Sequence, residues 1–192
     1  MDTRSVTTPA IFYRDLPVGE CRSNDLPVTD LTARSGPLWS ALENQALPSL
    51  SWVTPNKTHD GEGSSNATTA LEEADTWLAS LVALIAQSPS YTAGNTLVLV
   101  TYDEGFGGDA RTGEDCTDKA RDLPVTNGIS AHQDSCHVPL FVISPFARAG
   151  SDGTFFDHYS LTRTVEDLFH LSPLAHATDA QTSSLIGHFG IP

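Results

Sequence analysis

Thr96-Leu-Val-Leu-Val-Thr-Tyr-Asp-Glu-Gly105 is the stretch of this sequence that decides its fold. Its first seven residues are apolar, aromatic or β-branched, which is typical of a strand covered on both faces. Two carboxylates and a glycine follow at the point where that strand should end. Val138-Pro-Leu-Phe-Val-Ile-Ser144 has the same pattern, and its proline falls at the start, where a missing N–H is tolerated. The shorter run Leu50–Thr54 is predicted as a third strand that Pro55 stops.

Apolar residues at helical spacing separate these runs. Between Ala70 and Gln87 they indicate a helix that the following Ser-Pro pair ends. The same spacing predicts a helix over about Tyr159–Phe169, with Asp157 or His158 as its cap, and another over Leu38–Gln45. Strands that alternate with helices are the order of an α/β protein. The expected fold class is therefore α/β, a mostly parallel central sheet with flanking helices.

The segment Gly105–Asp134 interrupts this order and has little apolar periodicity. Loops of this length are usually functional or cross-linked. Cys116 and Cys136 flank it, and a disulfide between them would close a loop of about twenty residues, worth roughly 3 kcal/mol. Two free thiols are the alternative if the protein is cytosolic. Under the disulfide hypothesis Cys21 remains alone.

Length and composition exclude several classes of protein. The chain has 192 residues, enough for one core of ordinary size, and we expect a single domain over residues 1–192. Its 24 acidic and 10 basic residues give a net charge of −14, so binding to nucleic acid through a basic face is not expected. No apolar run approaches the roughly 20 residues that span a bilayer. No signal peptide is visible in the sequence.

Asp103 and Glu104 are the sharpest chemical signal. Adjacent carboxylates at the end of a buried strand repel each other unless something neutralises them, and a divalent cation held by oxygen ligands does so. Both can reach one cation only if the strand breaks at or just after Asp103, which Gly105 permits. Two solvated acids at the end of a strand are the alternative reading, and the residues alone leave both open.

Histidines follow two other predicted strands. In open α/β sheets ligands bind beyond the carboxyl ends of the strands. His59 and Asp60 would lie beyond the predicted strand Leu50–Thr54, and His158 beyond the predicted strand Val138–Ser144. These residues are candidates for metal or phosphate binding. From the residues alone, an ordinary polar turn is the preferred explanation of His59 and Asp60, while a position beside a helix cap explains His158 as well as ligand binding does.

Five segments in this order resemble the phosphoesterase family that contains bacterial acid phosphatases and non-haemolytic-type phospholipases C. This family is a branch of the alkaline phosphatase superfamily, and the chain looks like its secreted actinobacterial subgroup. Each segment is weak alone, but their order is specific and they cover nearly the whole chain. The matching segments are Leu47–Asn56, Ala74–Leu78, Asn95–Gly105, Cys136–Pro145 and Phe156–Leu168.

The resemblance implies a mechanism and a set of roles. A metal-activated hydroxyl attacks phosphorus, and the resulting phospho-enzyme is hydrolysed. Asp103 and Glu104 match the family's metal-ligand pair, while His59 and His158 match its catalytic histidine segments. The implied substrate is a small phosphate ester or a phospholipid, and the implied cofactor is a divalent metal ion, since carboxylate ligands accept Ca, Mg, Mn, Zn or Fe. The full-length family member is expected to be secreted.

The chain departs from the family in one respect. Family members begin with a strand followed by Glu-Asn-His/Arg-Ser, and a nucleophilic Ser or Thr comes later. Here the Glu-Asn pair is Glu43-Asn44, which lies in a predicted helix and is followed by Gln45. The chain thus looks like a truncated, alkaline phosphatase-like domain that is incomplete at its N-terminus. We expect metal binding with little or no phosphatase turnover by the 192-residue chain.

Three functions are compatible with these observations. The first is a metal-dependent phosphoric ester hydrolase. The second is a non-catalytic, metal-binding remnant of such an enzyme. The third is a sulfatase or a phosphoglycerate-mutase-like enzyme, which ranks last because the Cys/Ser-x-Pro-x-Arg signature of sulfatases is missing from the sequence.

Overall fold

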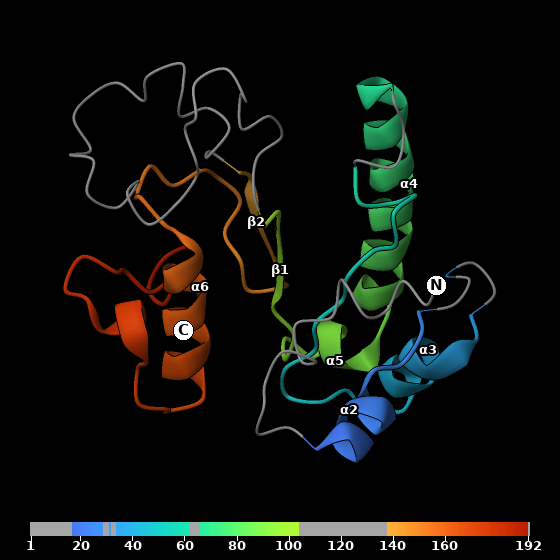
Figure 1. Ribbon diagram of the computed structural model, residues 1–192, viewed down its shortest axis with the longest axis horizontal. Coiled ribbons are helices and arrows are strands. Elements are labelled where there is room, and N and C mark those ends of the chain that lie inside the picture. The colour runs from blue at the N-terminus through green and yellow to red at the C-terminus, as the bar shows by residue number, and fades with distance from the viewer. Residues whose placement is uncertain (1–16, 29–30, 32–33, 62–65, 104–137, 192) are drawn as a thin grey trace. The chain divides into compact units, whose positions relative to one another are not determined.

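The computed structural model describes residues 17–28, 31, 34–61, 66–103 and 138–191. Its chain contacts divide it into two units, Met1–Asn95 and Thr96–Pro192. The expected single domain over residues 1–192 stays a prediction. Among the described residues, Figure 1 shows helices but no strand in the first unit, and a strand pair with helices in the second.

The first unit contains the helices α2 (Val18–Asn24), α3 (Gly36–Glu43), α4 (Ala67–Ala86) and α5 (Pro89–Thr92). The two helices predicted in this region are confirmed as α3 and α4, with shifted ends. α4 begins three residues before the expected Ala70, because the side chain of Asn66 accepts hydrogen bonds from the first free backbone N–H groups. The short helices α2 and α5 were not predicted.

Buried side chains of α3 and α4 form the core of the first unit. Leu42, Ala70, Leu81 and Leu84 are each at most 6% exposed. α5 packs against both helices and joins them at the C-terminal end of α4 (Figure 1). Gln87, just beyond α4, accepts a hydrogen bond of 2.6 Å from the Arg34 guanidinium.

The second unit contains the strands β1 (Val98–Thr101) and β2 (Leu140–Ile143). Both lie where the sequence predicted strands, and they pair in one sheet. The pairing is antiparallel, with Val98 opposite Ile143, so the prediction of a parallel sheet was wrong for these strands. The apolar runs suggested burial on both faces, but Phe141 is 54% exposed, and an antiparallel pair needs no such burial.

The predicted strand Leu50–Thr54 is also wrong, since this segment is neither helix nor strand. Prolines at positions 48 and 55 leave no N–H to donate at either end of the segment. Its side chains are not covered as those of a central strand would be, because Leu50 is 55% and Trp52 72% exposed.

The helix α6 (His158–Leu168) confirms the predicted helix over Tyr159–Phe169, and the 3₁₀ helix η4 (Ala175–Thr178) packs beside it (Figure 1). Asp157 caps α6 as expected, in a reciprocal capping box with Ser160. Along the described residues no helix is long and apolar enough to cross a membrane. The segment Gly105–Asp134 and the proposed disulfide Cys116–Cys136 lie outside the described residues.

Candidate functional site

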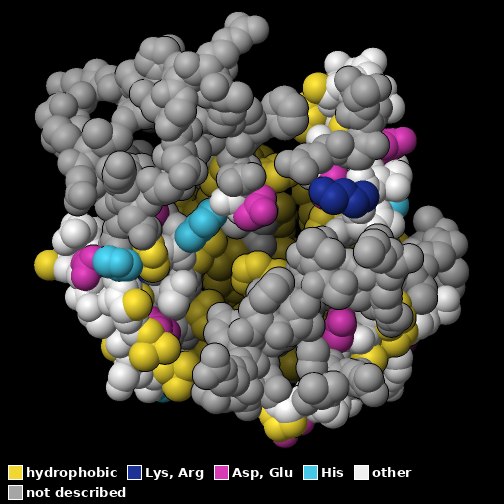
Figure 2. All heavy atoms as spheres, viewed as in Figure 1, with side chains coloured by type: hydrophobic (Ala, Val, Ile, Leu, Met, Phe, Trp, Pro, Cys, Tyr) yellow, Lys and Arg dark blue, Asp and Glu magenta, His cyan; other side chains and the backbone are white. Residues whose placement is uncertain are grey.

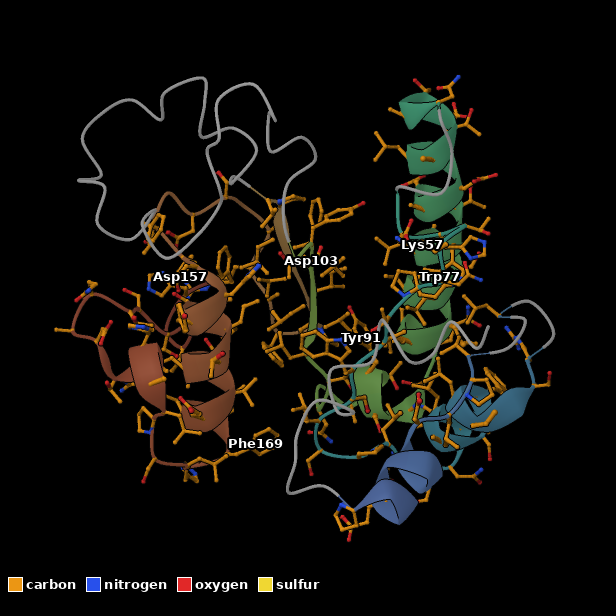
Figure 3. All side chains as sticks on the ribbon, in the orientation of Figure 1. Lys57, Trp77, Tyr91, Asp103, Asp157 and Phe169 are labelled. Carbon is orange, nitrogen blue, oxygen red and sulfur yellow. The ribbon has the colours of Figure 1, made fainter. Side chains whose placement is uncertain are left out.

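Asp103 and His158 meet at the start of α6 in the second unit. The chain bends at Asp103, two residues after β1 ends. Nε2 of His158 lies 2.6 Å from the main-chain oxygen of Asp103, and both residues are exposed. Figure 3 labels Asp103 beyond the end of β1 and Asp157 at the start of α6.

This hydrogen bond determines which ring nitrogen of His158 carries the proton. A main-chain carbonyl only accepts, so Nε2 of His158 must carry the proton and donate it. In the neutral ring Nδ1 then holds the lone pair, which is the atom left to bind a cation or accept a proton. Asp157 fixes the position of the ring further, because its side chain accepts the N–H of Ser160 at 2.8 Å and anchors the first turn of α6.

His59 and Asp60 belong to a turn of the first unit. The Asn56 side chain accepts the N–H of Thr58 at 3.0 Å, and its main-chain oxygen accepts the N–H of His59 at 2.9 Å. Lys57 pairs with Asp60 at 3.5 Å. The turn interpretation of this segment is therefore correct locally, and the turn sets the direction of the imidazole.

The imidazole of His59 stacks on the indole of Trp77 in α4, with ring centroids 5.9 Å apart and planes at 15°. Figure 3 shows Lys57 and Trp77 at the same level along this helix. The stack lies in a groove of about 670 Å³, whose lining carries carboxylates, hydroxyls and apolar groups but no lysine or arginine among the described residues. The groove is lined by Val28, Leu31, Asn56, Thr58, His59, Thr69, Glu72, Glu73, Thr76, Trp77 and Ser80.

The structure thus brings together one predicted pair, Asp103 and His158. His59 and Asp60 belong to the first unit, so the convergence of all these residues on one cleft stays a prediction. Glu104 lies outside the described residues. Its role as a partner of Asp103 also stays a prediction.

The donors at this place are of the kind that a divalent cation accepts. Carboxylate oxygen and imidazole nitrogen are donor types that Mn, Zn and Fe accept, but the bond between these two residues uses the main-chain oxygen of Asp103 and not its carboxylate. Within the residues that the structure describes, however, no three side chains of His, Cys, Asp or Glu are grouped to hold a metal ion. The described donors therefore supply only part of a coordination sphere.

A second aspartate–histidine pair in this unit was missed from the sequence. Nδ1 of His188 lies 2.8 Å from a carboxylate oxygen of Asp152. Hydrogen bonds from Thr154 and His188 lower the pKa of Asp152 from 3.8 to about 2. The two residues lie 36 positions apart and no periodic pattern connects them, so sequence spacing gave no signal.

The described residues form helices and a small antiparallel sheet, which is consistent with an α/β fold, and His158 bonds to the main chain just beyond the end of a strand. Residues 3–172 match the model of the phosphoesterase family. A protein of the yeast Kluyveromyces lactis named "Probable acid phosphatase" is 30% identical over 151 residues, which are 77% of this chain. The chain belongs to the phosphoesterase family.

The matched part spans 29% of the length of the Kluyveromyces lactis protein. No solved structure matches the chain. The family match ends at residue 172, so His188 lies beyond it.

Proposed function

We propose that this chain carries part of the site of a metal-dependent phosphoric ester hydrolase. In this proposal Asp103 and Glu104 are metal ligands, and His59 and His158 are the acid–base groups. The observation that carries it is the hydrogen bond of 2.6 Å between His158 and the Asp103 carbonyl, in a chain of the phosphoesterase family. A bound cation would supply neutralisation of phosphate oxygens and a lowered pKa for a bound hydroxyl.

His158 contributes proton transfer in this proposal. Its Nε2 proton is committed to the Asp103 carbonyl, so Nδ1 is the position at which the ring takes a proton from an attacking hydroxyl or gives one to a leaving oxygen. The capped first turn of α6 holds the backbone at His158, and the bond to the Asp103 carbonyl restricts the rotation of the ring. That restriction lowers the entropy cost of reaching a reactive geometry.

The proposed substrates are phosphomonoesters or phospholipid-type phosphodiesters. The name of the yeast relative favours the phosphomonoesters. The net charge of −14 repels anionic substrates, so a cation at Asp103 would have to offset this repulsion at the site. We also propose that the full-length protein is exported, because the chain resembles the secreted subgroup of the family.

A non-catalytic, metal-binding remnant is the second candidate. The sequence has no Glu-Asn-His/Arg-Ser segment, and the described residues do not complete a metal site. Both candidates include a cation at Asp103. They differ in whether the loaded site also binds phosphate.

Calorimetric titration with Mn²⁺, followed by inorganic phosphate, separates the two candidates. The hydrolase proposal predicts that phosphate binds to the Mn²⁺-loaded chain and not to the metal-free chain, even where turnover of 4-nitrophenyl phosphate is low. Asp103→Asn should weaken both binding steps by more than about tenfold. Asp75→Asn, the same change at an exposed position of α4, is the control and should weaken neither.

The outcomes are distinct. Mn²⁺ binding without phosphate binding contradicts the hydrolase proposal and supports the remnant. Phosphate binding that needs no metal contradicts both. Turnover at a rate typical of phosphatases would support the hydrolase and contradict the expectation that this chain lacks its nucleophile.

A further inference from the structure

The C-terminal stretch of the chain, residues 182–191, is part of the core of the second unit although the family match ends at residue 172. Leu185 is fully buried and Ile191 is 3% exposed. The N–H of Leu185 donates to the hydroxyl of Thr164 at 2.8 Å, and Thr164 is itself fully buried in α6. The stretch is therefore fixed to the helix that carries His158.

The same stretch is fixed to the segment that runs from β2 to α6. The N–H of Arg148 donates to the main-chain oxygen of Phe189 at 2.7 Å. Gly190 approaches this segment so closely that a Cβ atom there would lie 2.8 Å from the main-chain oxygen of Phe146. The two segments can pack this closely only because residue 190 has no side chain.

The Asp152–His188 pair joins the two segments through side chains. Asp152 accepts the N–H of Thr154 at 2.8 Å with one oxygen and the Nδ1–H of His188 at 2.8 Å with the other. The ring of Phe156 meets the His188 imidazole edge to face, with centroids 5.1 Å apart and planes at 88°. Phe156 also contacts the ring of Phe189, at 6.2 Å.

Phe156 directly precedes the residues that form the proposed site. Asp157 caps α6, and His158 donates to the Asp103 carbonyl. A shift of the Phe156 backbone would reach the imidazole within two residues. The contacts of Phe156 with the His188 ring therefore bear on the geometry at Asp103.

We propose that Asp152 and His188 are positioning residues for the imidazole of His158. They hold the segment before α6 in place, and that segment sets the ring on the Asp103 carbonyl. The inference rests on the proposed function in one respect, since that function makes His158 a site residue. The low pKa of Asp152 agrees with this role, because the carboxylate stays charged and accepts both bonds over the working range of pH.

The ring N–H of His158 gives a direct test by proton–nitrogen correlation spectroscopy of the ¹⁵N-labelled chain of 192 residues. An imidazole N–H bonded to a carbonyl exchanges more slowly with water than a free one and is more readily observed. His158→Gln identifies the signal by its loss. We expect the signal in the wild-type chain and its loss in His188→Ala.

Three further variants make the test specific. Asp152→Asn keeps the shape of the side chain and should also lose the signal, which guards against a misfolded His188→Ala. His188→Asn places an amide N–H near the position of Nδ1 and should restore the signal, which a merely space-filling role would not require. His170→Asn, just past the far end of α6, should leave it unchanged.

A His158 signal that persists in both His188→Ala and Asp152→Asn overturns the inference, as does its absence from the wild-type chain. Failure of the proposed function gives a different result from failure of this inference. In that case phosphate does not bind to the metal-loaded chain, while the dependence of the His158 signal on Asp152 and His188 is unaffected.

Discussion

Two histidines of the second unit differ in which ring nitrogen carries the proton. His158 donates from Nε2 to a carbonyl, and His188 donates from Nδ1 to a carboxylate. In the neutral rings the lone pair is therefore on Nδ1 of His158 and on Nε2 of His188. The local partner of each ring thus decides which atom is available for chemistry.

The contribution of Asp152 to the free energy of unfolding should be lost in acid. Its pKa is lowered from 3.8 to about 2, so its contribution to folding is complete above about pH 4 and disappears as the pH falls towards 2. The difference in unfolding free energy between the wild-type chain and Asp152→Asn should be constant near neutrality and shrink over this window. Urea unfolding at stepped pH measures it. A difference that grows as the pH falls would contradict this account.

Replacing Thr164 with valine should reduce stability although the two side chains have nearly the same volume. Its hydroxyl donates to the Ser160 carbonyl and accepts the N–H of Leu185 in a fully buried place. Thr164→Val leaves that N–H without an acceptor and should cost about 1–3 kcal/mol in urea unfolding. Thr162→Val removes a similar hydroxyl–carbonyl bond on the exposed face and should cost no more than about 0.5 kcal/mol. Equal losses would show that the bond to Leu185 contributes nothing.

At the scale of elements, the helices were the most predictable part. Asp157 was named as a candidate cap for α6, and the apolar spacing located α4, because both signals lie within a few residues along the chain. The strands were located too, but not their pairing. Pairing direction depends on contacts between β1 and β2, which are nearly forty residues apart, and apolar runs carry no information about it.

In the C-terminal stretch, we expect the cost of replacing a glycine to depend on how closely that glycine approaches another segment. Gly187 and Gly190 both have positive φ, at 84° and 86°, but only at Gly190 would a Cβ atom meet another group. Gly187→Ala should cost about 1 kcal/mol for the backbone conformation alone. Gly190→Ala should cost at least about 1 kcal/mol more, since the Phe146 carbonyl must move. Urea unfolding of both variants measures this, and equal costs would refute the close approach.

At the scale of the whole molecule, sequence motifs predicted the family, and the comparison over residues 3–172 confirms it. The site was predicted only in part. His158 was named from its segment, and its contact with Asp103 is found. Asp152 and His188 were not named, because tertiary packing alone brings them together across 36 residues. The stack of Trp77 on His59 was missed for the same reason.

The acidic surface of the chain also bears on the proposed cation. Among the residues that Figure 2 colours by type, acidic side chains outnumber basic ones on the face shown. A net charge of −14 favours the approach of cations from a distance, and added salt screens that attraction. Long-range attraction alone would not depend on one carboxylate. A large effect of changing Asp103 therefore separates a bound ion from a diffuse one.

Calorimetric titration of Mn²⁺ into the wild-type chain and into Asp103→Asn at physiological salt tests the central claim most directly. The account predicts one saturable site in the wild-type chain and an affinity more than about tenfold lower in Asp103→Asn. Asp75→Asn should bind as the wild-type chain does. Equal affinity in the wild-type and Asp103→Asn chains would contradict the assignment of Asp103 as a metal ligand.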